Sequence, residues 1–189
     1  LMAENNILHP DYYACNARDE AESLKAILEL PLVLKADGLA AGKGVVICEN
    51  DEDFEKGLDM MFDSSVFGAA SSRISLERCL KGEELSVFAV CDGENYKILN
   101  SAQDHKRAFD DDKGPNTGGM GAYSPTPLST KSLLNRVGKK IIEPTLLAMS
   151  DRGHPYVGFL YVGIMIVDGD PYVIEFNVRM GDPETQVVL

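Results

Sequence analysis

The sequence predicts an α+β fold in two lobes with mixed or antiparallel sheets. Along the chain, hydrophobic periodicity gives the order helix, two strands, helix, strands, long loop, helix and strands. The last two strands are joined by a short Asp-Gly-Asp turn, which is typical of an antiparallel hairpin. A polar bend between Glu77 and Glu84 marks the place where the two lobes are expected to meet.

The first third of the chain predicts two helices and two strands around a glycine-rich loop. Residues 18–30 place four apolar side chains on one helical stripe: Ala21, Leu24, Ile27 and Leu28. Residues 30–50 are typical of a strand, a loop at 36–44 and a second strand. Asn50 is a favourable N-terminal cap for the next helix, in which three apolar residues recur at helical spacing: Phe54, Leu58 and Met61.

The remainder of the chain predicts strands, a long loop and one more helix. Strands are expected at residues 73–77 and 84–91. Residues 100–127 are rich in Asp, Gly, Pro, Asn and Lys and show little periodicity, so a long loop is expected there, and loops of this length are often functional. The apolar spacing over residues 132–149 predicts a helix that is kinked or split at Pro144.

Bulk composition narrows the class of protein. The chain has 189 residues, 44% hydrophobic and 25% charged, which is enough to bury a sizeable core. The formal net charge of −12 argues against a general nucleic-acid-binding surface, but leaves room for an anion held by local basic residues. The four cysteines lack metal-binding spacing, which favours a reducing, intracellular setting. Without a membrane-spanning run or a signal peptide, a soluble protein with no membrane partner is expected.

The segment 172–186 carries the densest set of chemical side chains. On a strand, Glu175, Asn177 and Arg179 would share one face. The opposite face would be apolar: Ile174, Phe176 and Val178. Carboxylate and amide oxygens are hard ligands that suit Mg²⁺, and an arginine beside them suits phosphate or carboxylate. A solvated strand face with a salt bridge explains the same pattern.

The loop at 36–44 has the composition of a phosphate-binding loop. Glycines allow backbone N–H groups to approach an anion closely, and Lys43 adds a positive charge, with Lys35 at the end of the preceding strand. The spacing is not that of a Walker A motif, because Gly44 stands where Ser or Thr would bind Mg²⁺. A tight turn with an exposed lysine is the alternative interpretation.

Two further stretches suit ligand binding. The bend from Glu77 to Glu84 could hold a nucleotide base against Leu80 while Glu84 accepts hydrogen bonds from ribose hydroxyls, although an ordinary polar turn fits equally well. In residues 101–125, Lys106 and Arg107 offer anion contacts. Asp104 adds a carboxylate, and the backbone of Asn116 to Gly121 could curl around a small ligand. A disordered polar loop is the alternative, and the role of His105 stays open.

Four blocks follow one another along the chain: LVLKADGLAAGKGVV, LERCLKGEELS, QDHKR with GPNTGGMGAYSP, and GFLYVGIMIVDGDPYVIEFNVRMGDPETQ. Together they resemble the ATP-grasp region of the glycinamide ribonucleotide synthetases over about residues 32–186. The resemblance implies an ATP-grasp fold with a leading helical segment at 1–30, a lid lobe at 31–80 and a C-terminally truncated catalytic lobe at 81–189. It also implies a piece of a longer polypeptide, whose other N-terminal and C-terminal domains would be partners of this region.

The resemblance carries residue roles with it. For ATP it implies Lys35, Lys43, Gly42, Gly44, Glu77, Arg78, Leu80 and Glu84. For Mg²⁺ or Mn²⁺ it implies Glu175 and Asn177, with the number of metals open because YVGIMI on the preceding strand offers no further acid. Arg179 and Lys43 would act on the transferring phosphoryl group. The expected substrate contacts are Asp104, Lys106, Arg107, Asn116, Thr117, Gly118, Gly119, Met120, Asp182 and Glu184.

The family joins glycine to 5-phosphoribosylamine at the expense of ATP in cytoplasmic purine synthesis. A glycyl phosphate intermediate needs no protein nucleophile, which agrees with the lack of a Ser/His/Asp or Cys/His arrangement in the sequence. Two other readings stay open: a different ATP-grasp carboxylate–amine ligase, and a non-catalytic nucleotide-binding module. Retention of Lys35, Lys43, Glu84, Glu175, Asn177 and Arg179 argues against the module.

Overall fold

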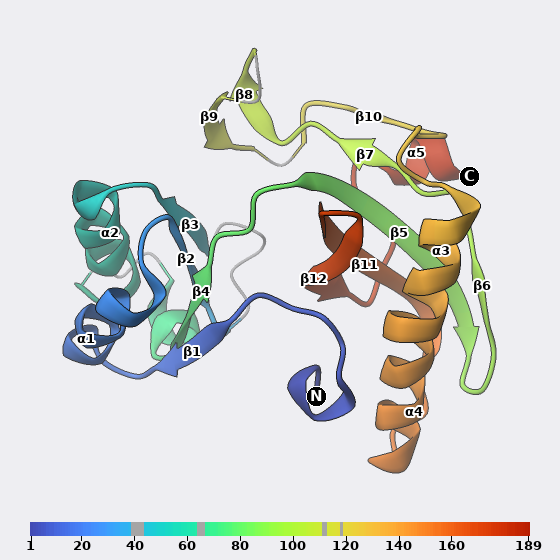
Figure 1. The fold of residues 1–189 in the computed structure, drawn as a ribbon, viewed down its shortest axis with the longest axis horizontal. Helices are drawn as coiled ribbons and strands as arrows, with labels where there is room; N and C mark the ends of the chain where they lie inside the picture. Colours follow the sequence, from blue (N-terminus) through green and yellow to red (C-terminus); the bar gives the residue numbers. More distant parts are fainter. Residues whose placement is uncertain (39–43, 64–66, 111–112, 118) are drawn as a thin grey trace. The chain divides into compact units, whose positions relative to one another are not determined.

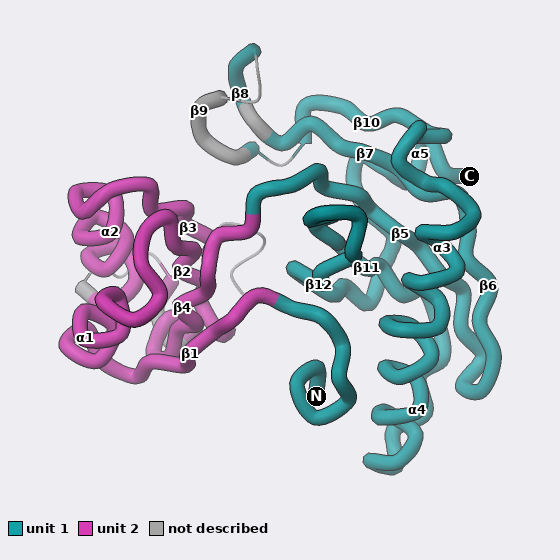
Figure 2. Tube along the Cα trace, viewed as in Figure 1, with its two compact units in different colours: residues 1–9, 81–189 teal, residues 10–80 magenta. Residues whose placement is uncertain are grey.

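The computed structural model describes residues 1–38, 44–63, 67–110, 113–117 and 119–189 (Figure 1). The chain forms two compact units, one made of residues 10–80 and the other of residues 1–9 and 81–189 (Figure 2). Each unit has its own sheet and its own core. No helix within the described part of the chain combines the length and the apolar character needed to cross a lipid bilayer.

The unit of residues 10–80 is a four-stranded antiparallel sheet with two helices on one face. The sheet order is β1 (Tyr12–Cys15), β4 (Ile74–Arg78), β2 (Leu32–Ala36) and β3 (Val45–Cys48). Helices α1 (Arg18–Leu28) and α2 (Asp51–Leu58) bury apolar side chains against it, followed by a π turn (Asp59–Asp63) and a 3-10 turn (Gly68–Ser71). Residues 10–30, which are part of the predicted leading segment at 1–30, supply β1 and α1 to this unit.

The local signals for α2 agree with the structure. The Asn50 side chain accepts a hydrogen bond from the Asp53 backbone N–H at 2.9 Å, so the predicted cap is confirmed. Phe54, Leu58 and Met61 are all buried in the core of this unit. Burying these three apolar side chains removes most of their surface from water, which stabilises the helix against the sheet.

The second unit is built on another four-stranded antiparallel sheet. Its order is β12 (Asp170–Asn177), β11 (Val157–Val167), β5 (Glu83–Asp92) and β6 (Tyr96–Ile98). One face packs against α3 (Lys131–Val137) and α4 (Glu143–Asp151) through the main apolar core. The N-terminal segment, with a 3-10 turn at Ala3–Asn5, joins this unit, because the Leu8 carbonyl accepts a hydrogen bond from the Val173 N–H at 2.8 Å.

The predicted helix over residues 132–149 is present, with one local change. A π turn (Gly138–Ile142) lies between α3 and α4, directly before the first turn of α4 that contains Pro144. Proline lacks an N–H and cannot donate to the preceding turn, so a wider turn at this point accommodates it.

The segment predicted as a long loop folds as an irregular hairpin, so that prediction is wrong in part. It contains β7 (Gln103–Asp104), β8 (Arg107–Phe109), β9 (Lys113–Asn116) and β10 (Ala122–Tyr123), with β7 paired to β10 and β8 to β9. Backbone hydrogen bonds continue between these pairs, including His105 N–H to the Gly121 carbonyl at 2.8 Å. Pairing is carried by the backbone, and the interspersed Gly and Pro hide it from side-chain periodicity.

Candidate functional site

In the unit of residues 10–80, the chemical side chains lie on the sheet face opposite the core. Leu32 and Leu34 of β2 are fully buried, so alternation turns Lys35 to the other face. There the Lys35 Nζ lies 2.7 Å from Glu77 Oε2, and the Ser75 hydroxyl donates to Glu77 Oε1 at 2.8 Å. Both charged side chains are at least three-quarters buried, at 23% and 14% exposure, so this ion pair is largely shielded from solvent.

The glycine-rich loop begins and ends with ordered backbone contacts. The Gly44 carbonyl accepts from the Ala36 N–H at 2.8 Å, and the Gly38 N–H donates to the Ala70 carbonyl at 2.8 Å. A Cβ on Gly38 would come within 2.5 Å of the Ala70 Cα, so this close approach requires glycine. The predicted phosphate-binding residues Gly42 and Lys43 lie outside the described residues.

The bend after β4 is held by contacts with Asp11 and Pro31, two residues earlier in the same chain. The Arg78 N–H donates to the Asp11 carbonyl at 2.9 Å, and the Arg78 Nε lies 3.4 Å from the Asp11 carboxylate. The Cys79 N–H donates to the Pro31 carbonyl at 3.2 Å. The predicted adenine contact Leu80 follows directly and is partly exposed.

In the second unit, Lys106 gathers three carboxylates from three elements. Its Nζ lies 2.5 Å from Glu84 Oε1 on β5, 3.8 Å from Glu175 Oε1 on β12 and 3.9 Å from Asp104 Oδ2 on β7. We call these four residues the Lys106 cluster. The cluster therefore brings together residues with different predicted roles: Glu84 for ribose, Glu175 for metal, and Asp104 and Lys106 for substrate. Glu84 and Glu175 are 91 positions apart in the sequence.

Burial and neighbouring charges both shift pKa values in the Lys106 cluster. Burial favours the neutral forms of Asp104 and Lys106, whereas the attraction between them favours the charged forms. Burial raises the pKa of Asp104 to about 6, even though Lys106 acts to lower it, because Glu84 and Glu184 add negative charge nearby. Burial opposes the charge of Lys106, but the neighbouring Tyr161, Glu84 and Asp104 outweigh that effect and raise its pKa. Lys106 therefore stays positively charged at neutral pH. The Asp104 carboxyl, with a pKa of about 6, changes its protonation state just below neutral pH.

A hydrogen-bonded layer lies beneath the Lys106 cluster. The Ser86 hydroxyl is 3.0 Å from the Tyr161 hydroxyl and donates to Glu184 Oε1 at 3.1 Å. Glu184 is 3% exposed, and burial raises the pKa of Tyr161. Sequence reasoning missed Ser86 and Tyr161, although polar groups inside the apolar runs of β5 and β11 were a usable signal.

The predicted arrangement on β12 is right in its centre and wrong at both ends. Glu175 and Asn177 share a face, paired with Gly163 and Tyr161 of β11. Ile174 is the extra residue of a β-bulge, because Val173 pairs with Ile164 while Glu175 pairs with Gly163.

The strand ends at Asn177, which removes the residues beyond it from the predicted alternation. Val178 is 76% exposed and does not join an apolar face. Arg179 lies in the following bend and donates from Nη1 to the Met180 carbonyl at 2.9 Å, so it does not continue the strand face of Glu175 and Asn177.

Gly119 lies close to Asp182 and Pro183. Thr117 donates from Oγ1 to the Lys106 carbonyl at 2.9 Å and accepts from the Gly119 N–H at 3.1 Å. Gly119 has a φ of +114°, and a Cβ there would lie 2.5 Å from the Pro183 Cδ and 3.5 Å from the Asp182 carbonyl oxygen. Met120 is 63% exposed. Arg107 and Asn116 pair in register across β8 and β9, while Gly118 lies outside the described residues.

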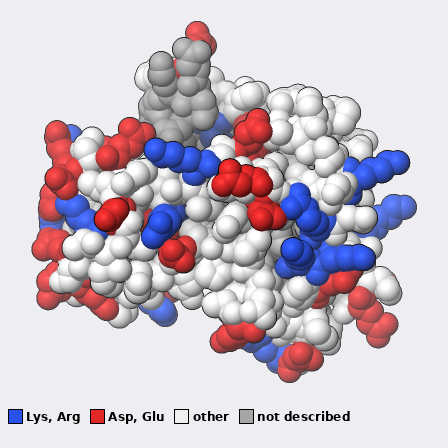
Figure 3. Space-filling model, in the orientation of Figure 1, with Lys and Arg blue, Asp and Glu red and all other residues white. Residues whose placement is uncertain are grey.

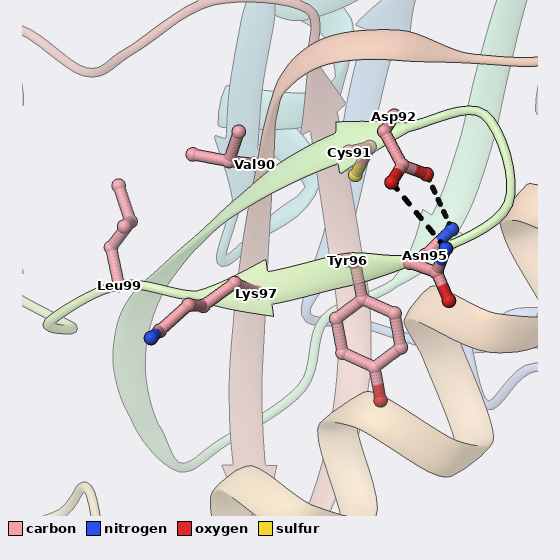
Figure 4. A pocket seen from close by; sticks show the side chains of 7 residues that line it. All are labelled: Val90, Cys91, Asp92, Asn95, Tyr96, Lys97 and Leu99. Atoms are coloured by element: carbon pink, nitrogen blue, oxygen red, sulfur yellow. Dashed lines mark hydrogen bonds between the residues drawn. The ribbon is translucent and has the colours of Figure 1, made fainter.

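A shallow hollow elsewhere on this unit has none of the predicted site residues (Figure 4). It lies at the β5–β6 hairpin and is lined by Val90, Cys91, Asp92, Asn95, Tyr96, Lys97 and Leu99. Asp92 accepts backbone hydrogen bonds there from Asn95 at 2.6 Å and from Glu94 at 3.0 Å, which satisfy the hairpin turn. The Lys106 cluster is the better candidate, because its charged groups converge.

The structure places two oxygen donors for a hard cation on one face of β12. Glu175 is 45% exposed in its side chain and shares its strand face with Asn177, so one carboxylate and one amide oxygen are available to a hard cation. Among the described residues, no three His, Cys, Asp or Glu side chains are grouped to hold a metal by themselves. The two donors therefore fit Mg²⁺ or Mn²⁺ only if ligand oxygens complete the coordination.

Comparison with known families decides the relationship. The profile described as phosphoribosylglycinamide synthetase, ATP-grasp (A) domain, matches residues 1–185. The chain belongs to this family. The resemblance drawn from the sequence motifs is thereby confirmed.

Curated relatives agree with this family. A phosphoribosylamine–glycine ligase of Leptospira interrogans is 45% identical over 190 residues, which cover 100% of this chain and 45% of the relative. That of Chlorobaculum tepidum is 51% identical over 176 residues, covering 91% and 41%. A bifunctional purine biosynthetic protein of Schizosaccharomyces pombe is 46% identical over 189 residues, covering 100% and 24%. The chain thus spans about half the length or less of the curated relatives that it matches.

Solved structures show the fold. A phosphoribosylamine–glycine ligase of Thermotoga maritima superposes with a TM-score of 0.90 at 37% identity, over 99% of this chain and 47% of that chain. The biotin carboxylase domain of a Hydrogenobacter thermophilus 2-oxoglutarate carboxylase, solved with ADP, magnesium and bicarbonate, has a TM-score of 0.75 at 17% identity. It covers 97% of this chain and 39% of that one, and at this identity it shows the fold alone. The predicted ATP-grasp fold is confirmed.

Surface charge agrees with small-molecule chemistry. On the face drawn in Figure 3, the described Lys and Arg residues are interspersed with Asp and Glu and do not form a continuous basic surface. The net charge of −12 points the same way. This family member has, in its second unit, a mixed-charge cluster suited to a small polar ligand and a cation.

Proposed function

We propose that the whole protein ligates glycine to 5-phosphoribosylamine, with cleavage of ATP, in the purine biosynthesis of the cytoplasm. Membership in the phosphoribosylglycinamide synthetase family supports this assignment. The observation that carries it is the Lys106 cluster, where residues from three motifs of that family converge within 3.9 Å of one ammonium group. The products would be glycinamide ribonucleotide, ADP and phosphate.

The reaction would proceed in two displacements. The glycine carboxylate oxygen attacks the γ-phosphorus, the bond to the β-phosphate oxygen breaks, and glycyl phosphate and ADP form. The amine of 5-phosphoribosylamine then attacks the acyl carbon, phosphate leaves, and the amine loses a proton. Because both nucleophiles belong to the substrates, the protein contributes alignment, charge and exclusion of water.

Glu175 and Asn177 would hold Mg²⁺ or Mn²⁺ together with phosphate oxygens. The shared strand face of the two residues supports this role. When bound, the metal neutralises charge on the transferring phosphoryl group. Arg179 would contact that group or the acyl phosphate from the bend after β12, where its exposure to solvent leaves it room to reorient.

The nucleotide would be held chiefly by lysines and by the bend after β4. Lys35 and Lys43 would bind phosphates, with Gly42 and Gly44 shaping the loop. Glu77, Arg78 and Leu80 would meet the adenine and Glu84 the ribose. Lys35 and Glu77 are paired at 2.7 Å, so an incoming phosphate must share or displace this partner.

The substrate contacts would come from the irregular hairpin and from the segment after β12. Asp104, Lys106, Arg107, Asp182 and residues 116–120 are the proposed contacts. Burial of Glu184 against Ser86 favours a supporting role for that carboxylate, which would fix the wall of the site. Contact between Gly119 and Pro183 supports one continuous wall from these two segments.

The decisive experiment measures ADP formation by the full-length protein. We expect turnover to require both glycine and 5-phosphoribosylamine, and Glu175→Gln to reduce it by about 10²-fold or more. Glu94→Gln, an exposed carboxylate in the β5–β6 turn, is the matched control and should retain activity. Turnover with another carboxylate–amine pair instead would identify a different ATP-grasp ligase.

The chain of 189 residues is expected to bind ATP weakly and to show little ligase activity by itself. The reason is that it spans only about half the length of its relatives. Calorimetric titration with ATP and Mg²⁺ measures the binding, and phosphate release measures the activity. Turnover by the chain equal to that of the full-length protein would contradict this prediction, and unchanged metal-dependent ATP binding in Glu175→Gln would favour a non-catalytic module.

A further inference from the structure

Gly163 occupies the position directly across from Glu175 in the β11–β12 pair. A Cβ built on Gly163 would lie 2.8 Å from the Glu175 Cγ and 3.2 Å from the Tyr161 Cε1. Carbon atoms pack no closer than about 3.5 Å at optimal separation. The Glu175 side chain therefore lies in the space that any other residue at position 163 would fill.

The backbone at Gly163 does not explain the choice of glycine. Gly163 is absent from the described glycines with positive φ, so an L-amino acid could adopt its conformation. The contact that forbids a side chain is with the second carbon of Glu175, close to the backbone of β12. That carbon can move away only if the first side-chain torsion rotates or the strand backbone shifts, and either change moves the carboxylate as well.

Two neighbouring features make the position of this carboxylate consequential. Its Oε1 lies 3.8 Å from the Lys106 Nζ, at the edge of ion-pair distance. The β-bulge at Ile174 is adjacent, and bulges increase local twist and re-aim the side chains beside them. A displaced Glu175 would thus leave both the Lys106 cluster and the strand face that it shares with Asn177.

We propose that Gly163 is a positioning residue, which leaves a slot across β11 that fixes Glu175 beside Lys106 and Asn177. The slot is a property of the fold. Its consequence for metal and nucleotide binding rests on the proposed function of Glu175 as a metal ligand. The two parts can be tested separately in the chain as it exists.

The slot is tested by a thermal-unfolding cycle. Gly163→Ala should lower Tm by roughly 4–10 °C, because overpacking a strand contact is destabilising. In a Glu175→Ala background, which removes the Cγ, Gly163→Ala should lower Tm by less than half as much. In a Glu175→Gln background, which keeps the Cγ but removes the charge, the full shift should persist. Equal shifts in all three backgrounds would overturn the slot.

The positioning role is tested by Mn²⁺ binding in the presence of ADP, followed by electron paramagnetic resonance. Gly163→Ala should weaken Mn²⁺ binding by about tenfold or more, comparable to Glu175→Gln, since metal ligation depends on ligand placement. Gly138→Ala is the matched control: its Cβ would meet the Tyr96 hydroxyl at 2.5 Å on the helix side of the same sheet. It should destabilise this unit without weakening Mn²⁺ binding.

The outcomes separate the two ideas. If Glu175→Gln binds Mn²⁺ as tightly as the unmodified chain, the proposed metal role of Glu175 is wrong, while the unfolding cycle still decides the slot. If Glu175→Gln weakens binding but Gly163→Ala weakens it no more than Gly138→Ala does, Gly163 is not a positioning residue. If Gly163→Ala and Glu175→Gln each weaken Mn²⁺ binding while Gly138→Ala does not, the proposal is supported.

Discussion

The two units organise charge in different ways. In the unit of residues 10–80, the Lys35 ammonium lies 2.7 Å from the Glu77 carboxylate, which also accepts a hydrogen bond from the Ser75 hydroxyl. In the other unit, Lys106 meets three carboxylates from β5, β7 and β12, and the buried Glu184 adds a further negative charge nearby. The first arrangement contains a close lysine–carboxylate pair, whereas the second has more negative than positive charge among its described members.

This difference indicates what each arrangement can accept. Because the Lys35 ammonium is already paired with the Glu77 carboxylate, an anion that approaches Lys35 must compete with Glu77 for it. A cluster with surplus carboxylates gains stability from an added cation, because each like-charge contact is then relieved. The contrast thus supports the proposed divalent metal at the carboxylates of the second unit, whereas the proposed phosphate at Lys35 has to compete with Glu77.

The largest expected effect comes from removing the centre of the Lys106 cluster. Lys106→Met should lower the free energy of unfolding by about 1–3 kcal/mol, because it leaves partly buried carboxylates without their counter-charge. Urea unfolding at neutral pH measures the change. Lys97→Met on β6 is the control, since that lysine is exposed, and it should leave stability within experimental error. Equal effects of the two substitutions would mean that the cluster is not held by charge.

A smaller effect is expected at Asp104 and depends on pH. The pKa of this carboxyl is raised from 3.8 to about 6, so the folded chain holds the proton more tightly than the unfolded chain does. The stabilising contribution is therefore present below pH 3.8 and is lost as pH rises through about 6. Asp104→Asn should remove this dependence and be more stable than the unmodified chain by about 1–2 kcal/mol at pH 7, but not at pH 4.

Urea unfolding of both proteins over this pH range checks the sign. A difference between them that stays constant from pH 4 to pH 7 would mean that Asp104 titrates normally. A difference that grows in favour of the unmodified chain as pH rises would mean that the attraction of Lys106 exceeds the effect of burial. Either result would mean that burial and the neighbouring carboxylates do not disfavour the ionised form of Asp104, contrary to the shift expected here.

The sequence predicted those parts of the site that depend on local alternation. Strand periodicity placed Glu175 and Asn177 on one face because neighbouring residues decide the pleat. It failed at Ile174, where the bulge adds a residue that only the partner strand reveals, and at Arg179, because the strand ends two residues earlier. The Asn50 cap was predictable for the same local reason.

The remaining features depend on contacts that are distant in the sequence. Ser86 and Tyr161 are 75 positions apart, and Ser86 and Glu184 are 98 apart, so no local pattern joins them. The irregular hairpin of residues 103–123 is paired through backbone groups, which carry no residue signature. The motif resemblance pointed to each residue of the Lys106 cluster separately. Only the fold shows that the Lys106 ammonium lies beside all three carboxylates.

The smallest expected effect is at the Lys35–Glu77 pair. Lys35→Met and Glu77→Gln should show a coupling free energy of about 0.5–1.5 kcal/mol in a double-mutant cycle, because the pair is mostly buried and its hydrogen bonds are short. Glutamine keeps a carbonyl oxygen for the Ser75 hydroxyl, so the cycle isolates the charge. The exposed Glu52–Lys56 pair on α2, at 2.6 Å, is the matched comparison and should show no measurable coupling. Coupling at Lys35 no larger than at Lys56 would mean that the pair is as loose as a surface pair, and a phosphate could then recruit Lys35 without competing with Glu77.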